Sequence, residues 1–191
     1  MRLSGALVRS ILCASLVTPS AWAVDSFTAN YTGQGSNAST CNMTFNISGQ
    51  EPTDYVDVVP LGPIAAQREL LANRIRALTP TQGTPLYTAV GASYSFLLDD
   101  FDAAKINALV VLSDGRNEDP RNPDIGGLLT TLRSTNEGQT TRPVRIFPIA
   151  FSGDADFRVL QQIAEATNAA AYDATDPTTI TRVFTAVVSN F

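Results

Sequence analysis

The sequence predicts an α/β fold in which a doubly wound, mostly parallel sheet carries helices on both faces. Strand-like and helix-like segments alternate from Tyr55 to the end of the chain, as they do in parallel sheets covered on both sides. Residues 107–112 are almost continuously apolar, which is typical of a strand buried on both faces. Behind Asp176 and Pro177, one apolar stripe at helical spacing runs to Phe191 and predicts a helix.

The remaining elements follow from local patterns. Short apolar or β-branched runs between turn residues predict strands, and apolar residues at helical spacing behind a Pro, Thr or Asp start predict helices. We expect a strand at Tyr55–Val59, a helix from Pro63 to Leu78, a helix with Thr84 as N-cap and Pro85 in its first turn, a helix over Ile125–Leu132, a strand at Val144–Phe151, a helix over Asp156–Thr167 and a strand at Ala169–Tyr172. Pro148 cannot donate a ladder hydrogen bond, so its position is expected to be unbonded or bulged.

Two interpretations fit residues 1–23. Two arginines, a short apolar run and Ala21-Trp22-Ala23 have the outline of a secretory signal peptide with its cleavage site. Alternatively, apolar residues at helical spacing predict a helix from Leu3 to Ala14, followed by a strand between Ala21 and Phe27. The residues leave both interpretations open.

Residues 28–52 are rich in Asn, Ser, Thr and Gly and predict a surface loop, with a short extended piece at Met43–Ile47. Its four glycosylation-type triplets are of the kind that such a composition yields by chance; they start at Asn30, Asn37, Asn42 and Asn46. We therefore divide the chain into an N-terminal segment, 1–53, and a domain, 54–191.

Composition excludes several functions. The 191 residues suffice for one domain, and 13 basic against 18 acidic residues without a basic cluster disfavour nucleic acid as a partner. No histidine is present, which excludes histidine catalysis and histidine ligation of zinc. No apolar run approaches the roughly 20 residues of a transmembrane helix. Cys13 and Cys41 form either one disulfide or two inert thiols.

Two oxygen-bearing side chains stand where ligands are bound in such folds. Asp114 directly follows the buried strand 107–112, and parallel sheets bind ligands beyond the carboxyl ends of their strands. Thr84 begins a helix, and hydroxyl and carboxylate oxygens suit Mg²⁺. Taken singly, each has a simpler explanation, because Asp is common in turns and Thr in helix caps.

The phrases around both residues resemble those of a known family. Gly-Thr-Pro-Leu-Tyr at 83–87 and Leu-Ser-Asp-Gly-Arg-Asn-Glu-Asp at 112–119 are similar to the von Willebrand factor type A domain. The resemblance extends from Asp54 to Phe191. It is strongest to the C-terminal type A domains of actinobacterial secreted or lipid-anchored proteins that have an upstream solute-binding-like domain. It implies a Rossmann-like fold and an extracytoplasmic location.

The resemblance also implies a metal-ion-dependent adhesion site. Thr84 and Asp114 match two of its three ligand loops, which hold Mg²⁺ or Mn²⁺ while an Asp or Glu of a protein partner completes the coordination. The third element, D-x-S-x-S after the first central strand, is absent; Asp25-Ser26-Phe27-Thr28-Ala29 has the wrong order. We therefore expect a fragment, or a start placed too late, whose sheet lacks the first central strand and is only marginally stable.

The implied function is binding rather than catalysis. A metal-independent scaffold or a truncated, non-functional fragment is the alternative, and a metal-dependent hydrolase using Asp114 is less favoured. The sequence has neither the phosphate-binding loop G-x-x-x-x-G-K-[ST] nor the G-x-S-x-G elbow, and it contains no histidine. Glu118 and Asp119 could form a second carboxylate group, but charged residues in such a loop are expected to be solvated.

Overall fold

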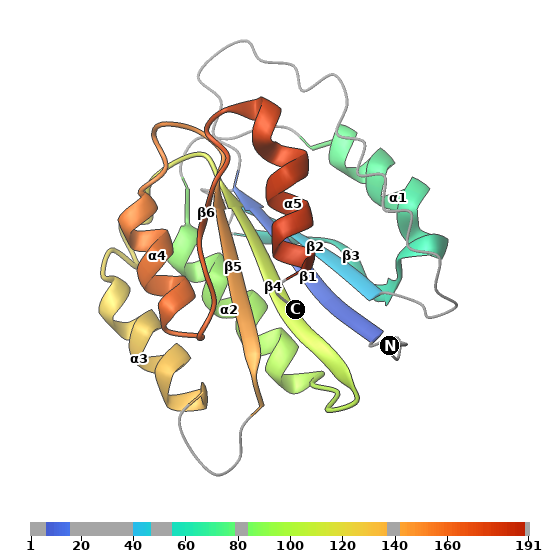
Figure 1. Ribbon diagram of the computed structural model, residues 1–191, viewed down its shortest axis with the longest axis horizontal. Helices are drawn as coiled ribbons and strands as arrows, with labels where there is room; N and C mark the ends of the chain where they lie inside the picture. The colour runs from blue at the N-terminus through green and yellow to red at the C-terminus, as the bar shows by residue number, and fades with distance from the viewer. Residues whose placement is uncertain (1–6, 16–39, 47–54, 79–83, 137–141, 190–191) are drawn as a thin grey trace.

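The sheet has six strands in the order β3-β2-β1-β4-β5-β6 (Figure 1). The computed structural model describes residues 7–15, 40–46, 55–78, 84–136 and 142–189. The strands are β1 (Leu7–Ser15), β2 (Thr40–Asn46), β3 (Tyr55–Pro63), β4 (Lys105–Ser113), β5 (Val144–Ala150) and β6 (Tyr172–Asp173). All neighbouring strands are parallel except β2 and β3, so the predicted fold class, a mostly parallel α/β sheet, is confirmed.

The centre of the sheet is formed by β1, which pairs with β2 on one side and with β4 on the other. The predicted helix from Leu3 to Ala14 is therefore wrong for residues 7–15, which are a strand. Its apolar spacing fits either structure in so short a run, and the strand gains ladder hydrogen bonds on both edges. The position expected to lack a strand is thus held by β1. The strand predicted at Ala21–Phe27 lies outside the described residues.

The polar region before residue 54 also contributes a strand. Of the extended piece expected at Met43–Ile47, residues 43–46 belong to β2, which lies antiparallel to β3, and Ile47 lies outside the described residues. The sheet therefore includes strands from both sides of the boundary expected at 53/54.

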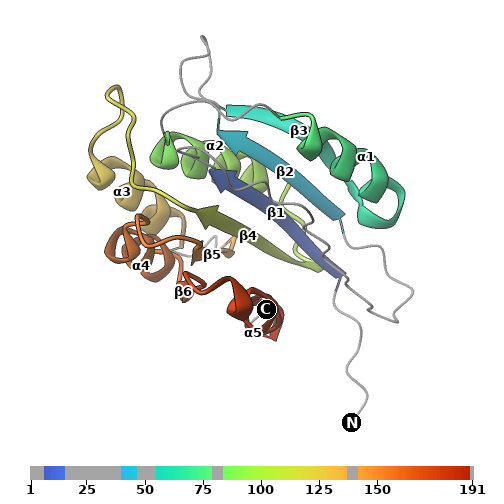
Figure 2. The ribbon, with the colours of Figure 1, turned by 90° about the horizontal axis from the view of Figure 1, so that it is seen from above.

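The helices cover both faces of the sheet. They are α1 (Ile64–Arg76), α2 (Leu86–Asp99), α3 (Ile125–Asn136), α4 (Phe157–Glu165) and α5 (Ile180–Ser189), the last preceded by a 3-10 turn, η1 (Pro177–Thr179). Figure 2 shows α2, α3 and α4 on one side of the sheet and α1 and α5 on the other. None of the helices described is both long and apolar enough to cross a membrane.

A hydrophobic core lies on each face of the sheet, and alternate residues of β4 contribute to one core or the other. Leu109 and Val111 pack among residues of α2, α3 and α4, whereas Ala108 and Val110 pack against α5. All four are buried, so β4 is covered on both faces as its apolar sequence predicts. In β5, Pro148 lies level with Val111 and the pairing runs through it without a shift, so no bulge is formed there.

The strand register keeps the two cysteines apart. Cys13 of β1 lies level with Thr44 of β2, while Cys41 lies level with Ser10. Three residues along a strand span about 10 Å, beyond the roughly 7 Å that a disulfide can bridge between Cα atoms. Of the two states expected, this arrangement therefore favours the free thiols.

Candidate metal site

The candidate site lies where several parallel strands end at the same level. Ser15 of β1 pairs with Ser113 of β4, Ser113 pairs with Ala150 of β5, and Ala150 pairs with Asp173 of β6. Because Ser113 and Ala150 end their strands, the loops that follow β4 and β5 begin side by side. The site is built from the loop after β4, the loop after β5 and the start of α2.

Thr84 lies at the base of α2, and its side chain does not cap the helix. The helix begins at Leu86 behind Pro85, and no side-chain hydrogen bond caps it. The expected N-cap role of Thr84 is therefore wrong. Its side chain is 1% exposed, and Oγ1 is buried without a hydrogen-bond partner among the described residues. A buried hydroxyl without a partner is costly, and a bound ion or an ordered water is one explanation for it.

Asp114 is held by the loop that follows β5. The Ser152 hydroxyl donates a hydrogen bond to the Asp114 carbonyl and accepts one of 3.1 Å from the Asp154 amide. One residue earlier, the Phe151 amide donates to the Ser113 carbonyl over 2.9 Å. Asp114 Oδ1 is buried. The backbone that carries this carboxylate is thus fixed by its neighbour loop.

The loops of Thr84 and Asp114 are in direct contact. A Cβ atom added to Gly115, the residue after Asp114, would lie 3.2 Å from Thr84 Oγ1. The Thr84 carbonyl also accepts a hydrogen bond of 2.9 Å from the Glu118 amide. The structure therefore brings the two predicted ligand loops together.

A network of side chains joins the loop after β4 to the first turn of α2. Asn117 accepts a 3.2 Å hydrogen bond from the Tyr87 amide and donates one of 2.9 Å to the Asn122 carbonyl. Asp119 Oδ2 accepts one of 2.8 Å from the Thr88 hydroxyl, and Asn122 donates to that hydroxyl over 3.1 Å. Sequence reasoning missed this network. Its only signal is the density of Asn and Asp in residues 117–124, which is typical of turns.

Asp119 is not a solvated residue, contrary to expectation, whereas Glu118 is exposed. Asp119 is 6% exposed. Burial acts to raise its pKa, but hydrogen bonds from Thr88 and from the Arg121 and Asn122 backbone, with the Arg121 charge, hold the pKa below its ordinary value. The carboxylate therefore stays ionised inside a network that satisfies it.

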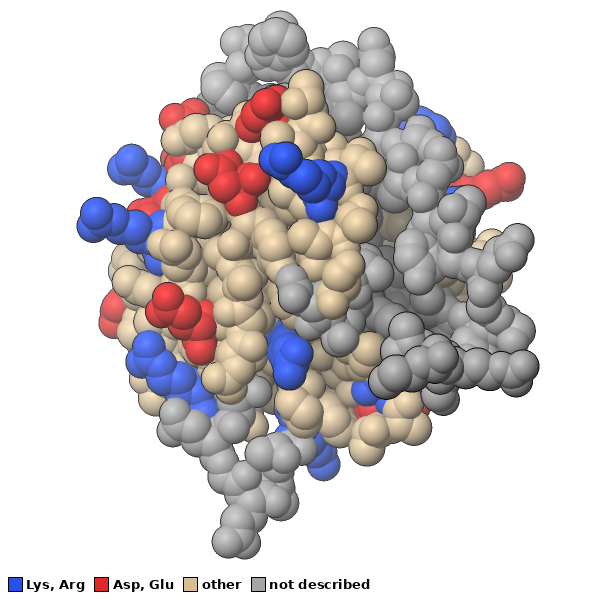
Figure 3. Space-filling view, viewed as in Figure 1, with Lys and Arg blue, Asp and Glu red and all other residues tan. Residues whose placement is uncertain are grey.

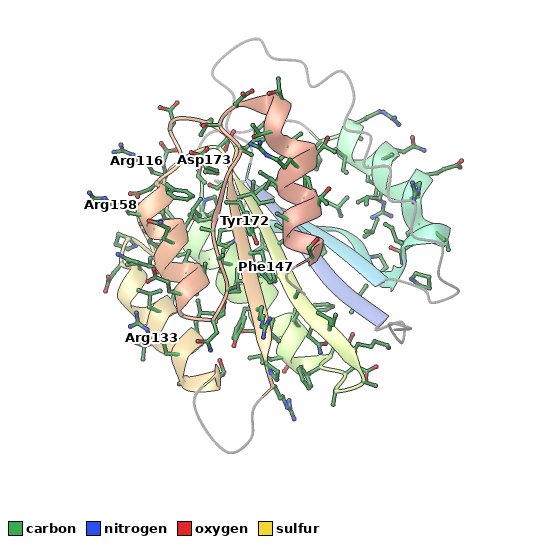
Figure 4. All side chains as sticks on the ribbon, viewed as in Figure 1. Arg116, Arg133, Phe147, Arg158, Tyr172 and Asp173 are labelled. Atoms are coloured by element: carbon green, nitrogen blue, oxygen red, sulfur yellow. The ribbon has the colours of Figure 1, made fainter. Side chains whose placement is uncertain are left out.

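The surroundings of the site are predominantly acidic. Burial raises the pKa of Tyr87, and the nearby charges of Asp156 and Asp124 raise it further. Residues 114–124 and 152–156 contain six acidic and two basic side chains. Figure 4 shows one of the basic residues, Arg116, at the same end of the sheet as Asp173. On the face seen in Figure 3, the described Lys and Arg side chains form no continuous basic area, as the composition predicts.

This arrangement of strands, helices and loops is found in solved structures. A von Willebrand factor type A structure from Catenulispora acidiphila matches with a TM-score of 0.67 and 14% sequence identity, over 95% of this chain and 42% of that one. The chain has the von Willebrand factor type A fold. No protein-family model and no curated protein matches its sequence.

Two other type A matches carry metal. One is proximal thread matrix protein 1 from the mussel byssus with a zinc-occupied metal-ion-dependent adhesion site (TM-score 0.57, 13% identity, 93% of this chain and 45% of that one). The other is the manganese-loaded TRAP protein of Plasmodium vivax (TM-score 0.52, 14% identity, 83% and 63%). The chain spans less than half of the Catenulispora and mussel structures. Identities this low establish the fold, so the site has to be argued from the residues.

The residues present fit part of a divalent-cation site. The type A fold brings a hydroxyl, Thr84, next to the loop of a carboxylate, Asp114, and both are oxygen ligands of the kind that Mg²⁺ and Mn²⁺ accept. Among the described residues, no group of three or more His, Cys, Asp or Glu side chains could hold a metal ion. Hydroxyl groups and water would have to supply the other ligands.

In the family that the sequence resembles, a third group of ligands follows the first central strand, and β1 is the central strand here. Residues 16–20 read Leu-Val-Thr-Pro-Ser and lie outside the described residues. Leu16 directly follows Ser15, just as Asp114 follows Ser113, which pairs with Ser15. Hydroxyl residues stand two and four positions after Leu16, as they do after the Asp of D-x-S-x-S. The strand register reveals this similarity in sequence, because it places Ser15 of β1 level with Ser113 of β4.

Proposed function

We propose that the chain is a protein-binding module of the adhesion type whose Thr84 and Asp114 contribute to a site for Mg²⁺ or Mn²⁺. In this proposal the site is incomplete, because the sequence lacks D-x-S-x-S and has a leucine, Leu16, directly after the last residue of β1. The module works outside the cytoplasm, in keeping with the family that its sequence resembles. Residues 54–191 carry the two ligand loops, and no catalytic role is assigned to Asp114.

The observation that carries this proposal is the buried Thr84 hydroxyl. A Thr before a helix is ordinarily explained by capping, but here the side chain makes no capping hydrogen bond. Leaving a buried hydroxyl without a partner costs about 1–3 kcal/mol. Because Oγ1 lies against the residue after Asp114, a cation bound by Asp114 would give this hydroxyl a partner.

The charge of the surrounding loops indicates why a cation is needed. The loops after β4 and β5 are acidic overall, so an acidic side chain of a protein partner is repelled by them. A divalent cation between the acidic loops and the partner turns this repulsion into attraction, since the partner's carboxylate can then become a ligand of the metal. The proposed partner is therefore a protein that offers an Asp or Glu to the metal.

Titration calorimetry with Mn²⁺ and Mg²⁺ tests the proposal on four proteins: the parent chain, Leu16→Asp, Leu16→Asp with Asp114→Ala, and Leu16→Asp with Asp173→Ala. We expect Mn²⁺ binding to be weak or undetectable in the parent and clear in Leu16→Asp. Asp114→Ala should abolish the gain. Asp173→Ala is the matched control, because Asp173 is an exposed carboxylate that also ends a strand of the sheet. It should leave binding intact.

Two results would contradict the proposal. If Leu16→Asp binds no metal, the fold is a metal-independent scaffold. If metal binds equally with and without Asp114→Ala, the metal lies elsewhere in the chain. A parent that binds Mn²⁺ and loses it on Asp114→Ala would support the metal site and remove the need for a carboxylate at position 16.

A further inference from the structure

The residues around Thr84 are joined to the loop after β4 by both backbone and side chains. The Glu118 amide donates a hydrogen bond of 2.9 Å to the Thr84 carbonyl, and the Tyr87 amide donates one of 3.2 Å to Asn117 Oδ1. Thr88, in the first turn of α2, donates a hydrogen bond to Asp119 over 2.8 Å. These contacts span 30 or more positions in sequence, so they connect two elements that the chain itself does not hold together.

Asp119 is the centre of this connection. Oδ2 is engaged by Thr88, and Oδ1 accepts a 2.9 Å hydrogen bond from the Arg121 amide, with Arg121 Nε at 3.9 Å. Burying a charge is costly unless it is paired and hydrogen-bonded, and here both oxygens have partners within the network. Both oxygens are thereby committed to the protein, which leaves Asp119 poorly suited to be a metal ligand itself.

We infer that Asp119 is the positioning residue of the candidate site: through Thr88 it fastens residues 115–122 to α2 and so fixes Thr84 against the loop of Asp114. The inference rests on the proposed function for its purpose, because a metal site needs its ligands held in place before the cation arrives. Groups that orient metal ligands without touching the metal typically contribute 10–100-fold to metal affinity. Sequence alone predicts instead that Asp119 is solvated.

The first test measures attachment of the loop without any metal. Amide hydrogen exchange is followed at Glu118, whose amide bonds Thr84, and at Val110, a buried residue of β4 that reports global opening. The variants are Thr88→Val, which removes the hydroxyl at nearly constant volume, and Asp119→Asn. Thr88→Ser is the control, because it keeps the hydroxyl and removes only the methyl group. We expect Thr88→Val and Asp119→Asn to speed exchange at Glu118 at least tenfold more than at Val110. Thr88→Ser should retain the parent's ratio.

The second test measures Mn²⁺ affinity for the same variants in the Leu16→Asp protein. Thr88→Val and Asp119→Asn should weaken binding about 10–100-fold, and Thr88→Ser should restore it. Equal acceleration of Glu118 and Val110 in every variant would overturn the inference, because Asp119 would then serve only global stability. Faster exchange at Glu118 with unchanged Mn²⁺ affinity would overturn it as well.

The two tests separate this inference from the proposed function. If Leu16→Asp binds no Mn²⁺ at all, the proposed function fails on that result, and hydrogen exchange alone decides whether Asp119 holds Thr84 in place. Loss of protection at Glu118, reversed by Thr88→Ser, supports the positioning role even then.

Discussion

Thr84 Oγ1 and Gly115 are so close that a methyl group on Gly115 would lie only 3.2 Å from the hydroxyl. This contact joins the start of α2 to the residue after Asp114, although the two positions are separated by a whole helix and the strand β4. The hydroxyl is buried there without a hydrogen bond among the described residues. An unsatisfied buried hydroxyl lowers stability, so removing the Thr84 hydroxyl should have a measurable effect on the metal-free protein.

Thr84→Val should stabilise the metal-free protein. Valine has nearly the shape of threonine, so the substitution removes an unsatisfied buried hydroxyl without opening a cavity. We expect a gain of about 1 kcal/mol, or roughly 2–4 °C in Tm for a chain of this size, measured by thermal unfolding in EDTA. The same variant should lose the Mn²⁺ binding conferred by Leu16→Asp.

Ser93 provides the matched control for Thr84. Its hydroxyl is also buried in α2 without a partner among the described residues, but it lies in the core rather than beside Gly115. Ser93→Ala should raise Tm in the same way and leave Mn²⁺ affinity unchanged. A lower Tm for Thr84→Val in EDTA would show that Thr84 Oγ1 has a partner in the metal-free protein.

Gly115→Ala should disturb the site through Thr84. A separation of 3.2 Å is tighter than ordinary van der Waals contact, so one of the two groups has to shift by a few tenths of an ångström. Forcing extra volume into a packed site costs about 1–3 kcal/mol. Denaturant unfolding of Gly115→Ala, Thr84→Ala and the double variant measures the coupling between them. The cost of Gly115→Ala should shrink once Thr84 is truncated, and strictly additive effects would contradict the contact.

Asp119 should make stability depend on pH only in the acid range. Its pKa in the folded protein lies below the ordinary value. The stabilisation it provides is therefore fully present above the unfolded pKa of about 3.9, and it is lost as the pH falls through the lower, folded pKa. The stability difference between the parent and Asp119→Asn should be constant from about pH 5 to 7 and shrink below about pH 4.

Thr88→Val should weaken this acid dependence while leaving the carboxylate in place, because the Thr88 hydrogen bond helps to lower the pKa of Asp119. Urea unfolding at a series of pH values gives all three curves. A parent that differs equally from Asp119→Asn at pH 3 and pH 7 would show that the network does not depend on the charge.

The sequence predicts the fold from short-range rules, whereas the ligand roles expected of Thr84 and Asp114 come from the family resemblance of the residues around them. Asp114 follows a buried strand and Thr84 precedes a helix, and the fold class then places strand ends at one edge of the sheet. The burial of Asp119 could not be predicted in this way, since it depends on a loop folding back onto a helix 31 positions earlier. The loop sequence alone is equally compatible with a solvated turn.

The prediction of a helix in the N-terminal segment is wrong for a different reason. The apolar residues of 7–15 fit a helix and a strand about equally well, so periodicity cannot decide. The decision comes from the ladders that β2 and β4 offer on either side, which are not visible in residues 7–15. The same ladders set the register of the cysteines, about which the sequence pattern carries no information.

The thiols of Cys13 and Cys41 should both be free in the folded chain. Their strand positions are offset by three residues, which places their Cα atoms beyond the reach of a disulfide. Titration with a thiol reagent under denaturing conditions, without reductant, should give two equivalents per chain. Intact mass measured before and after reduction provides the check. A loss of two hydrogens in the unreduced chain, with no dimer formed, would contradict the register between β1 and β2.

The central place of β1 makes its backbone sensitive to proline. Ile11 lies level with Asn42 of β2 and with Leu109 of β4, so the strand is paired on both edges at this point. Ile11→Pro removes an amide donor from the middle of the sheet, and proline is found there essentially only on edge strands or at bulges. Ile11→Ala is the matched control, because it shortens the side chain but keeps the amide.

Thermal unfolding followed by circular dichroism should show one cooperative transition for the parent, a lowered Tm for Ile11→Ala, and loss of the transition for Ile11→Pro. Equal transitions for all three proteins would mean that residues 7–15 do not form the central strand, and the sheet would then begin with β4.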